Sequence, residues 1–328
     1  MSEINKSGKT IFKGEAMLLI ASVIWGSAFI FQKMGMDHIG PMTFTFFRFG
    51  IGALCMIPVI AFADRMKRRR ISRMTGNDAA CIEHGNDAAC RAEQPSGVMS
   101  FSNKTLVVGG LLVGASNYVA AGLQQFGLVY TTAGKAGFIT SMEMVMVPFI
   151  LVLLRKKVHW LTWIGVVIAT VGLYLLCMQG GFYMEPGDLM CLGGALGYAV
   201  QILLIDHFVE KVDPLKLAFY EFAVTTVLCF VTAVIMEDID LAPVIDCAVP
   251  ILYTAVLEVC VAFSLQMLGQ RYAPPALATI TMSLESVFAA ISGVLFLGEI
   301  MSGREVWGCV IMFCAFIIAQ LPEMRGEK

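Results

Sequence analysis

The chain has 328 residues, of which 58% are hydrophobic and only 15% are charged. Soluble domains usually carry about a quarter charged residues, so this composition excludes an ordinary soluble protein and indicates an integral membrane protein. The net charge of −2 says little by itself, because the placement of basic residues matters more than their sum in such proteins.

Ten apolar stretches follow one another along the chain, each close to the roughly 20 residues with which a helix crosses a bilayer. Five of them contain no charged residue: 16–32, 105–134, 158–184, 189–205 and 306–322. The other five contain one each: Arg48 in 42–63, Glu143 in 136–154, Glu221 in 217–236, Glu258 in 247–270 and Glu285 in 272–298. The sequence therefore predicts an all-α integral membrane protein with ten transmembrane helices.

The basic residues are distributed very unequally between the two sides of these spans. If both termini lie on one side, 19 of the 23 Lys and Arg residues fall on that side, and only Lys33, Lys135 and Arg304 fall on the other. Basic residues accumulate in cytoplasmic loops, so the terminal segments 1–15 and 322–328 are expected in the cytoplasm. We expect a multi-pass protein of the cell (inner) membrane.

The most polar segment, 64–104, separates the second span from the third. It opens with a basic run and contains the sequence Gly-Asn-Asp-Ala-Ala-Cys twice, ending at Cys81 and at Cys90. One interpretation is a metal or redox site made by these cysteines and His84. The other is a tandem duplication in a disordered cytoplasmic insert, which is favoured because neither cysteine belongs to a Cys-x-x-Cys pair.

Two of the charged spans have matching surroundings at one constant offset. Leu123, Gln124, Gly127, Tyr130, Ala136, Ser141, Glu143 and Val145 recur 142 positions later as Leu265, Gln266, Gly269, Tyr272, Ala278, Ser283, Glu285 and Val287. A charged side chain at the centre of a membrane helix costs roughly 2.5–3.5 kcal/mol on an insertion scale, so it is rarely kept without a use. A duplicated one indicates a transporter built from two repeats.

The two repeats are predicted at 16–178 and 187–321, with five spans in each. Because five is odd, the second repeat must enter the membrane in the opposite sense, which gives an inverted-topology pair. The loop charges agree with this. The loop at 155–157 is Arg-Lys-Lys, whereas its counterpart at 298–305 contains two glutamates and a single arginine.

Several short motifs occur in order along both repeats. The first repeat has Ala-Ser-Val-Ile-Trp-Gly-Ser-Ala-Phe at 21–29, Phe-Phe-Arg-Phe at 46–49, and the stretch 128–140 that leads to Glu143 and Pro148. The second has Gln-Arg-Tyr-Ala at 270–273, Leu-Glu-Ser-Val at 284–287 and Leu-Gly-Glu at 297–299. In these motifs, and over essentially the whole chain apart from 64–104, the protein resembles the EamA-type exporters of the drug/metabolite transporter superfamily.

The resemblance implies two inverted five-helix repeats (5+5) around a central cavity formed mainly by spans 1, 3, 4, 6, 8 and 9. It also implies a secondary transporter that exports a small metabolite by alternating access. Four acids against one base within the spans favour a cationic or zwitterionic substrate such as an amino acid, or exchange for protons. The competing hypothesis is an intramembrane flippase or enzyme that acts on a lipid headgroup.

The candidate substrate or coupling residues are polar side chains expected near this cavity. Glu258 comes first, because its counterpart in the first repeat is Ser116 and the repeat itself does not require an acid there. Glu143 and Glu285 could hold substrate or a coupling proton, or could serve the structure by capping free backbone N–H groups. The remaining candidates are Trp25, Asn117, Gln124, Gln201 and Gln266.

Three further charged residues, Arg48, Glu221 and Lys135, are candidates for ion pairs or gates. A buried ion pair of Glu258 with Arg48 or Lys135 is the structural alternative to a role of Glu258 in transport. No catalytic constellation, metal-ligand cluster or nucleotide-binding motif is recognisable, so we expect a non-enzymatic protein without cofactor, metal or nucleic-acid partner. Its partners are expected to be a small-molecule substrate and the lipid bilayer, and the protein to be a monomer or a homodimer.

Overall fold

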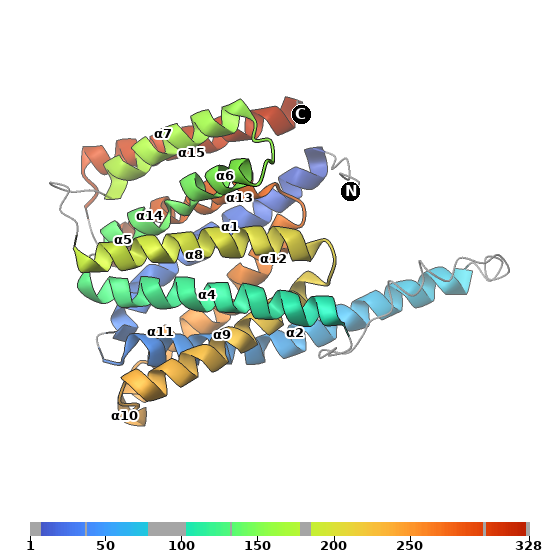
Figure 1. The fold of residues 1–328 in the computed structure, drawn as a ribbon, viewed down its shortest axis with the longest axis horizontal. Helices are drawn as coiled ribbons and strands as arrows, with labels where there is room; N and C mark the ends of the chain where they lie inside the picture. Colours follow the sequence, from blue (N-terminus) through green and yellow to red (C-terminus); the bar gives the residue numbers. More distant parts are fainter. Residues whose placement is uncertain are drawn as a thin grey trace.

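The computed structural model describes residues 8–36, 38–77, 103–131, 133–177, 185–297 and 300–325, which form a bundle of helices without strands (Figure 1). Within these residues, ten helical segments are long and apolar enough to cross a membrane. The prediction of an all-α membrane protein with ten spans is therefore confirmed.

The first five spans are α1 (Gly8–Met36), α2 (Pro41–Asn77), α4 (Lys104–Tyr130), the pair α5 (Ala133–Thr140) and α6 (Glu143–Leu153), and α7 (Trp160–Cys177). The other spans are α8 (Pro186–Val209), α9 (Pro214–Met236), the run α11 (Ala248–Tyr253), η1 (Thr254–Phe263) and α12 (Ser264–Gln270), the pair α13 (Pro275–Met282) and α14 (Glu285–Leu297), and α15 (Gly303–Arg325). The short helix α10 (Leu241–Asp246) leads into the eighth span. The start of α1 and the end of α15 lie at the same end of the bundle, as an even number of crossings requires (Figure 1).

The second helix continues beyond its apolar span. We expected a disordered insert from residue 64, but α2 runs through the basic segment to Asn77 and projects past the bundle (Figure 1). Arg, Lys and Met are strong helix formers, which explains why the helix continues where the apolar residues stop. The proposed Cys81, His84 and Cys90 site lies outside the described residues.

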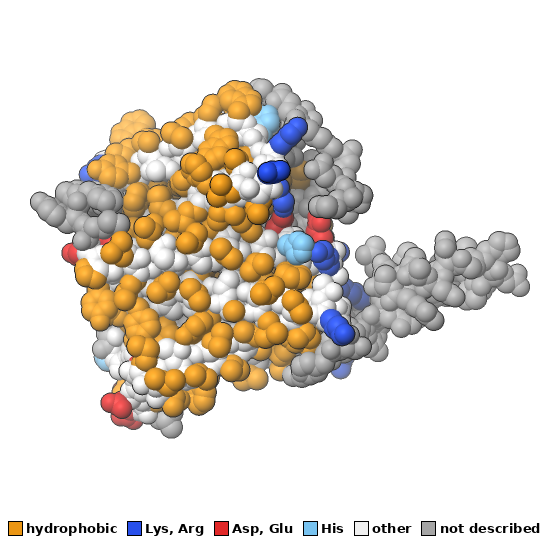
Figure 2. Space-filling model, in the orientation of Figure 1, with side chains coloured by type: hydrophobic (Ala, Val, Ile, Leu, Met, Phe, Trp, Pro, Cys, Tyr) orange, Lys and Arg blue, Asp and Glu red, His pale blue; other side chains and the backbone are white. Residues whose placement is uncertain are grey.

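The outer surface of the bundle matches a lipid environment. Large apolar side chains cover the face shown in Figure 2. Many large apolar side chains of the described residues are strongly exposed, among them Leu153 at 81% and Leu295 at 72%. On this face the Lys and Arg side chains gather mostly at one end of the bundle (Figure 2). An apolar surface of this extent indicates contact with lipid tails rather than with water.

Helices of the first half of the chain pack largely on helices of the second half. The main pairs are α4 with α8 and α9, α2 with α9, α7 with α15, and α1 with α14. In four of these pairs a glycine lies close to the backbone of the partner helix: for example, a Cβ added at Gly127 would lie 2.8 Å from the carbonyl oxygen of Gly187, and one at Gly172 would lie 2.9 Å from that of Gly308. Small residues at crossings let membrane helices approach this closely, so van der Waals packing holds the halves together.

The α2–α9 pair is also joined by polar contacts at both ends. At one end Lys216 Nζ lies 3.3 Å from Asp64 Oδ2. At the other, the Glu237 carboxylate accepts hydrogen bonds from the backbone N–H groups of Met42 and Thr43 at 2.8 Å each, and from the Thr43 hydroxyl at 2.7 Å. The first N–H groups of a helix have no partner within the helix, and a negative charge suits that end. Glu237 therefore caps α2 from a different span.

Glu237→Ala is expected to lower the free energy of unfolding by about 1–3 kcal/mol, because it leaves the first N–H groups of α2 without their acceptor. Thermal unfolding of the detergent-purified protein measures the effect. The control is Asp246→Ala, which removes an exposed acid that makes no hydrogen bond or ion pair with the described residues. Equal melting temperatures for the two variants would show that the cap contributes nothing.

Candidate functional site

Both repeat glutamates begin the second half of a broken helix. The fourth span changes from α5 to α6 at Glu143, and the ninth changes from α13 to α14 at Glu285. At each junction a backbone N–H group donates to the carbonyl oxygen of the residue three positions earlier. Met144 N donates to Ser141 O at 3.1 Å, and Ser286 N donates to Ser283 O at 3.3 Å. The start of a helix favours negative charge, so each carboxyl group lies where the backbone stabilises it.

The proline at 148 is not the common cause of these junctions. A proline inside a helix can bend it, but here the change of geometry comes before Glu143, and Pro148 lies inside α6. The ninth span changes in the same way, although it contains no proline between 285 and 297. What the two junctions share is a Ser-x-Glu sequence, and the hydroxyl oxygens of Ser141 and Ser286 lie 3.2 Å apart.

Glu258 lies on a stretch of π-helix, η1, in the middle of the eighth span. Such wide turns are rare and occur frequently at functional sites. Glu258 is 4% exposed, and its Oε1 accepts hydrogen bonds at 2.9 Å from both Arg48 Nη1 and Gln32 Nε2. The buried ion pair with Arg48, one of the alternatives for Glu258, is therefore present in the structure.

Arg48 is the buried cation that pairs with Glu258. Its side chain is 1% exposed, and its guanidinium carbon lies 5.0 Å from the ring centre of Phe49 and 5.9 Å from that of Phe44. Aromatic faces attract cations, so these rings add to the carboxylate in stabilising a buried charge. The role of gate or ion-pair residue was predicted for Arg48, and its contacts are those of an ion pair.

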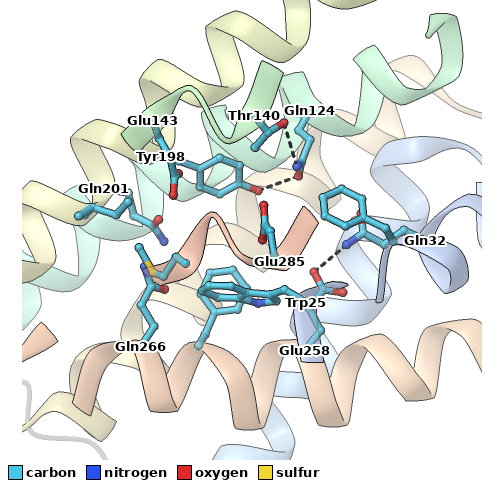
Figure 3. A pocket seen from close by; sticks show the side chains of 14 residues that line it. Trp25, Gln32, Gln124, Thr140, Glu143, Tyr198, Gln201, Glu258, Gln266 and Glu285 are labelled. Atoms are coloured by element: carbon cyan, nitrogen blue, oxygen red, sulfur yellow. Dashed lines mark hydrogen bonds between the residues drawn. The ribbon is translucent and has the colours of Figure 1, made fainter. Parts of the chain in front are cut away.

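Glu143, Glu258 and Glu285 all reach one cavity, which has about 480 Å³ of space unfilled by atoms, including space open to the outside (Figure 3). It is lined by Trp25, Phe29, Gln32, Gln124, Thr140, Glu143, Tyr198, Gln201, Ile202, Glu258, Phe263, Gln266, Met282 and Glu285. These residues come from spans 1, 3, 4, 6, 8 and 9, the spans that the family resemblance implied. A concave, partly apolar site with a few converging polar groups is the usual form of a small-molecule site.

The amide and hydroxyl groups on one wall of the cavity are bonded to each other. Tyr198 donates its hydroxyl proton to Gln124 Oε1 at 2.9 Å, and Gln124 Nε2 donates to the Thr140 hydroxyl at 3.3 Å (Figure 3). These bonds connect the sixth, third and fourth spans. They hold Tyr198 and Gln124 in place without using the three acids.

Other polar atoms of the cavity have no hydrogen-bond partner among the described residues. They are the acceptors Gln32 Oε1, Glu258 Oε2 and Gln266 Oε1, and the donor Trp25 Nε1. Buried polar atoms are nearly always satisfied in folded proteins, so these four atoms, on residues that line one cavity, lack the partner that such atoms usually have. Gln266 is only 2% exposed, and Figure 3 shows its side chain at the cavity.

Besides Arg48, two described candidates, Glu221 and Asn117, lie outside the cavity lining. Glu221 is completely buried and accepts a hydrogen bond from Gln201 Nε2, and Gln201 also donates to Asn117 Oδ1 at 3.3 Å. Asn117 in turn donates to the Thr225 hydroxyl at 3.1 Å. Asn117 and Glu221 therefore belong to a network between α4, α8 and α9, which only Gln201 connects to the cavity. The side chain of Lys135 lies outside the described residues.

The cavity contains residues that were not among the candidates, and part of them could have been found. Phe29 follows Trp25 by four residues, and Gln32 follows Phe29 by three, which places all three on one face of α1. That spacing was a usable signal. Tyr198 and Phe263 had no such signal, because aromatic residues are common throughout these spans. The described residues include no group of three or more His, Cys, Asp or Glu side chains that could hold a metal ion.

Ten helices long and apolar enough to cross a membrane contribute three acids to one cavity. The chain belongs to the EamA-like transporter family, whose model matches residues 12–82, 88–178 and 185–320. Ten spans and this membership together establish a multi-pass membrane protein with a small-molecule substrate.

Similar proteins support the same class without specifying what is transported. An uncharacterized transporter of Archaeoglobus fulgidus is 30% identical over 308 residues, covering 93% of this chain and 84% of its own. The uncharacterized transporter YwfM of Bacillus subtilis is 22% identical over 310 residues, covering 92% and 91%. A solved crystal structure with 16% identity matches 96% of this chain and 99% of its own at a TM-score of 0.67, which shows a shared fold.

Proposed function

We propose that this protein is a secondary transporter that exports a small polar metabolite carrying an amino group, an amino acid or a related amine, by alternating access. The observation that carries the proposal is the convergence of Glu143, Glu258 and Glu285 in one cavity. Ionisable groups inside membrane spans mark substrate or ion pathways by default. A cavity that has three acids and no Lys, Arg or His among the described residues of its lining suits a positively charged group.

The helix junctions support alternating access. The substrate sites of secondary transporters lie where discontinuous helices meet near the middle of the membrane. Here Glu143 and Glu285 lie at junctions in two different spans, and Ser141 and Ser286 connect those junctions. A relative movement of the two spans would change the surroundings of both acids together. The inverted arrangement of the halves, the outward direction and the cytoplasmic termini are parts of this proposal.

Proton exchange is the coupling we propose. Glu258 has Arg48 as its cation, whereas neither Glu143 nor Glu285 makes a salt bridge with a described side chain. A charge in a low-dielectric site must be balanced, so a proton or a cationic substrate has to neutralise each of these two acids. A site that binds either protons or the cationic substrate at one time, but not both, exchanges protons for substrate across the membrane.

Glu285→Gln is expected to abolish transport driven by a pH gradient while leaving equilibration of substrate down its own gradient measurable. Proteoliposomes loaded with substrate and given an imposed pH gradient provide the measurement. Glu221→Gln is the matched control, because Glu221 is a buried acid within a neighbouring span that does not line the cavity, and it should keep the response to the gradient. A Glu285→Gln protein that still concentrates substrate would remove this residue from the coupling.

The proposed function itself is tested by comparing metabolites in the medium of cells that contain or lack the protein, followed by transport of each enriched compound in proteoliposomes. We expect at least one small amine or amino acid to be enriched outside cells that contain the protein, and to be moved by the purified protein. If no such compound is moved but fluorescent lipids cross the proteoliposome bilayer, the lipid-headgroup alternative is correct and the export proposal is wrong.

A further inference from the structure

Within the proposed function, the charges of the cavity restrict the substrate further. Three carboxyl groups line the cavity, and the part of the lining that the structure describes includes no basic side chain. Arg48, which does not line the cavity, balances the charge of one of them, Glu258. That leaves Glu143 and Glu285, which begin half-helices in two different spans and have no salt bridge to a described side chain. The cavity can therefore balance two positive charges on a ligand.

The unsatisfied hydrogen-bonding atoms point to the same ligand chemistry. Three of the four unsatisfied atoms on lining residues, those of Gln32, Glu258 and Gln266, are acceptors, so a ligand that reaches them would supply N–H donors. The orientation of Gln32 is set by its neighbour, because its Nε2 donates to the Glu258 carboxylate and its Oε1 is left to accept. An ammonium group offers three donors and no acceptor, which matches this set.

A carboxylate on the ligand would find no cation among the described residues of the lining. The donors there are neutral: Trp25 Nε1, which has no hydrogen-bond partner, and the amide and hydroxyl groups of the Gln, Thr and Tyr side chains. The Arg48 guanidinium does not line the cavity, and Glu258 lies between it and the ligand space. A carboxylate would therefore face three acids without a cation of its own. Like charges at close range are a strong means of rejecting a ligand.

We infer that the cavity selects a small organic diamine, a molecule with two ammonium groups on an apolar spacer and no carboxylate, over zwitterionic amino acids and over monoamines. The two ammonium groups match Glu143 and Glu285 in charge. The spacer matches the apolar part of the lining, where Trp25 and Phe263 pack edge to face with ring centres 5.2 Å apart beside Phe29. The inference rests on the proposed function and specifies its substrate class.

Three probes that differ by one group each test the inference. 1,5-Diaminopentane differs from lysine only by the carboxylate, and from pentylamine only by the second ammonium group. Binding to the full-length protein in lipid nanodiscs is measured by calorimetry. We expect diaminopentane to bind at least about tenfold tighter than either of the others, which corresponds to about 1.4 kcal/mol. Lysine or pentylamine binding within threefold of diaminopentane would overturn the inference.

Variants of the two unpaired acids connect the preference to its cause. Glu143→Gln and Glu285→Gln keep the shape of each side chain, and each should reduce the preference for diaminopentane over pentylamine to about threefold or less. Pentylamine binding and the melting temperature report whether each variant is folded. An unchanged preference in both folded variants would also overturn the inference. Lysine export with weak diamine binding would refute the diamine but leave the export proposal intact, whereas the absence of any exported amine or amino acid would refute the export proposal.

Discussion

Arg48→Met is expected to lower the free energy of unfolding by about 3–5 kcal/mol, because it leaves the Glu258 carboxylate buried without its cation. The two atoms that form the pair are 2.9 Å apart, and the side chains are 1% and 5% exposed. Gln32 still donates to Glu258 in the variant, but one neutral amide does not balance a full charge. A fall in melting temperature and in the yield of monodisperse detergent-purified protein is the measurement.

The double variant Arg48→Met with Glu258→Gln separates the ion pair from simple loss of packing. Removing both charges at once removes the desolvation cost of each, so the double variant should recover most of the stability that either single variant loses. Arg304→Met is the control, since this exposed arginine lies over the Tyr174 ring and has no buried partner. Additive losses in the double variant would show that the pair does not stabilise the fold.

The spans and the repeat were predictable because their signals are local or periodic along the chain. A bilayer crossing needs only a run of apolar residues, and the duplicated acids appear as matching letters at one offset. Glu143 and Glu285 accordingly fall at equivalent helix junctions. The resemblance added which spans line the cavity, and the lining residues come from those spans.

The partners within the site were not predictable in the same way. Arg48 and Glu258 are 210 positions apart, and the sequence left Arg48 and Lys135 as equal choices for the pair. The choice depends on which helix faces lie opposite each other, which hydropathy does not encode. The π-helical turn at Glu258 was equally hidden, because no residue type in 254–263 distinguishes it from an ordinary helix. Asn117 was a cavity candidate by polarity alone, and it instead bonds neighbouring spans together.

The sequence also ranked Glu258 above Glu143 and Glu285 as the residue that recognises the charge of the substrate. The reason was that the repeat itself does not require an acid at position 258. The ion pairs in the structure favour the opposite ranking of these acids. Glu258 is the acid with a buried cation, whereas Glu143 and Glu285 have none among the described side chains. The duplicated acids are therefore the stronger candidates for binding what moves, and Glu258 for fixing the shape and polarity of the wall beside it.

A second large effect is expected at Gly26, where α1 crosses the start of α14. A Cβ there would lie 2.5 Å from the carbonyl oxygen of Glu285, 2.6 Å from the backbone nitrogen of Ala289 and 2.7 Å from Phe288 Cβ. None of these is the flexible end of a side chain, so Gly26→Ala must push α14 away. Overpacking of this kind costs about 1–3 kcal/mol, and only part of it is offset by the better helix propensity of alanine.

Because Glu285 is the first residue of α14, the displacement also moves a cavity carboxyl group, and Gly26→Ala should lose transport as well as stability. Gly137→Ala is the matched control: Gly137 is also a buried helical glycine, on α5, but the nearest heavy atom to an added Cβ is Ser286 Oγ at 4.0 Å. It should keep transport and melt at the wild-type temperature or above. Transport by Gly26→Ala at the level of Gly137→Ala would mean that α1 does not position Glu285, and that the cavity tolerates movement of that acid.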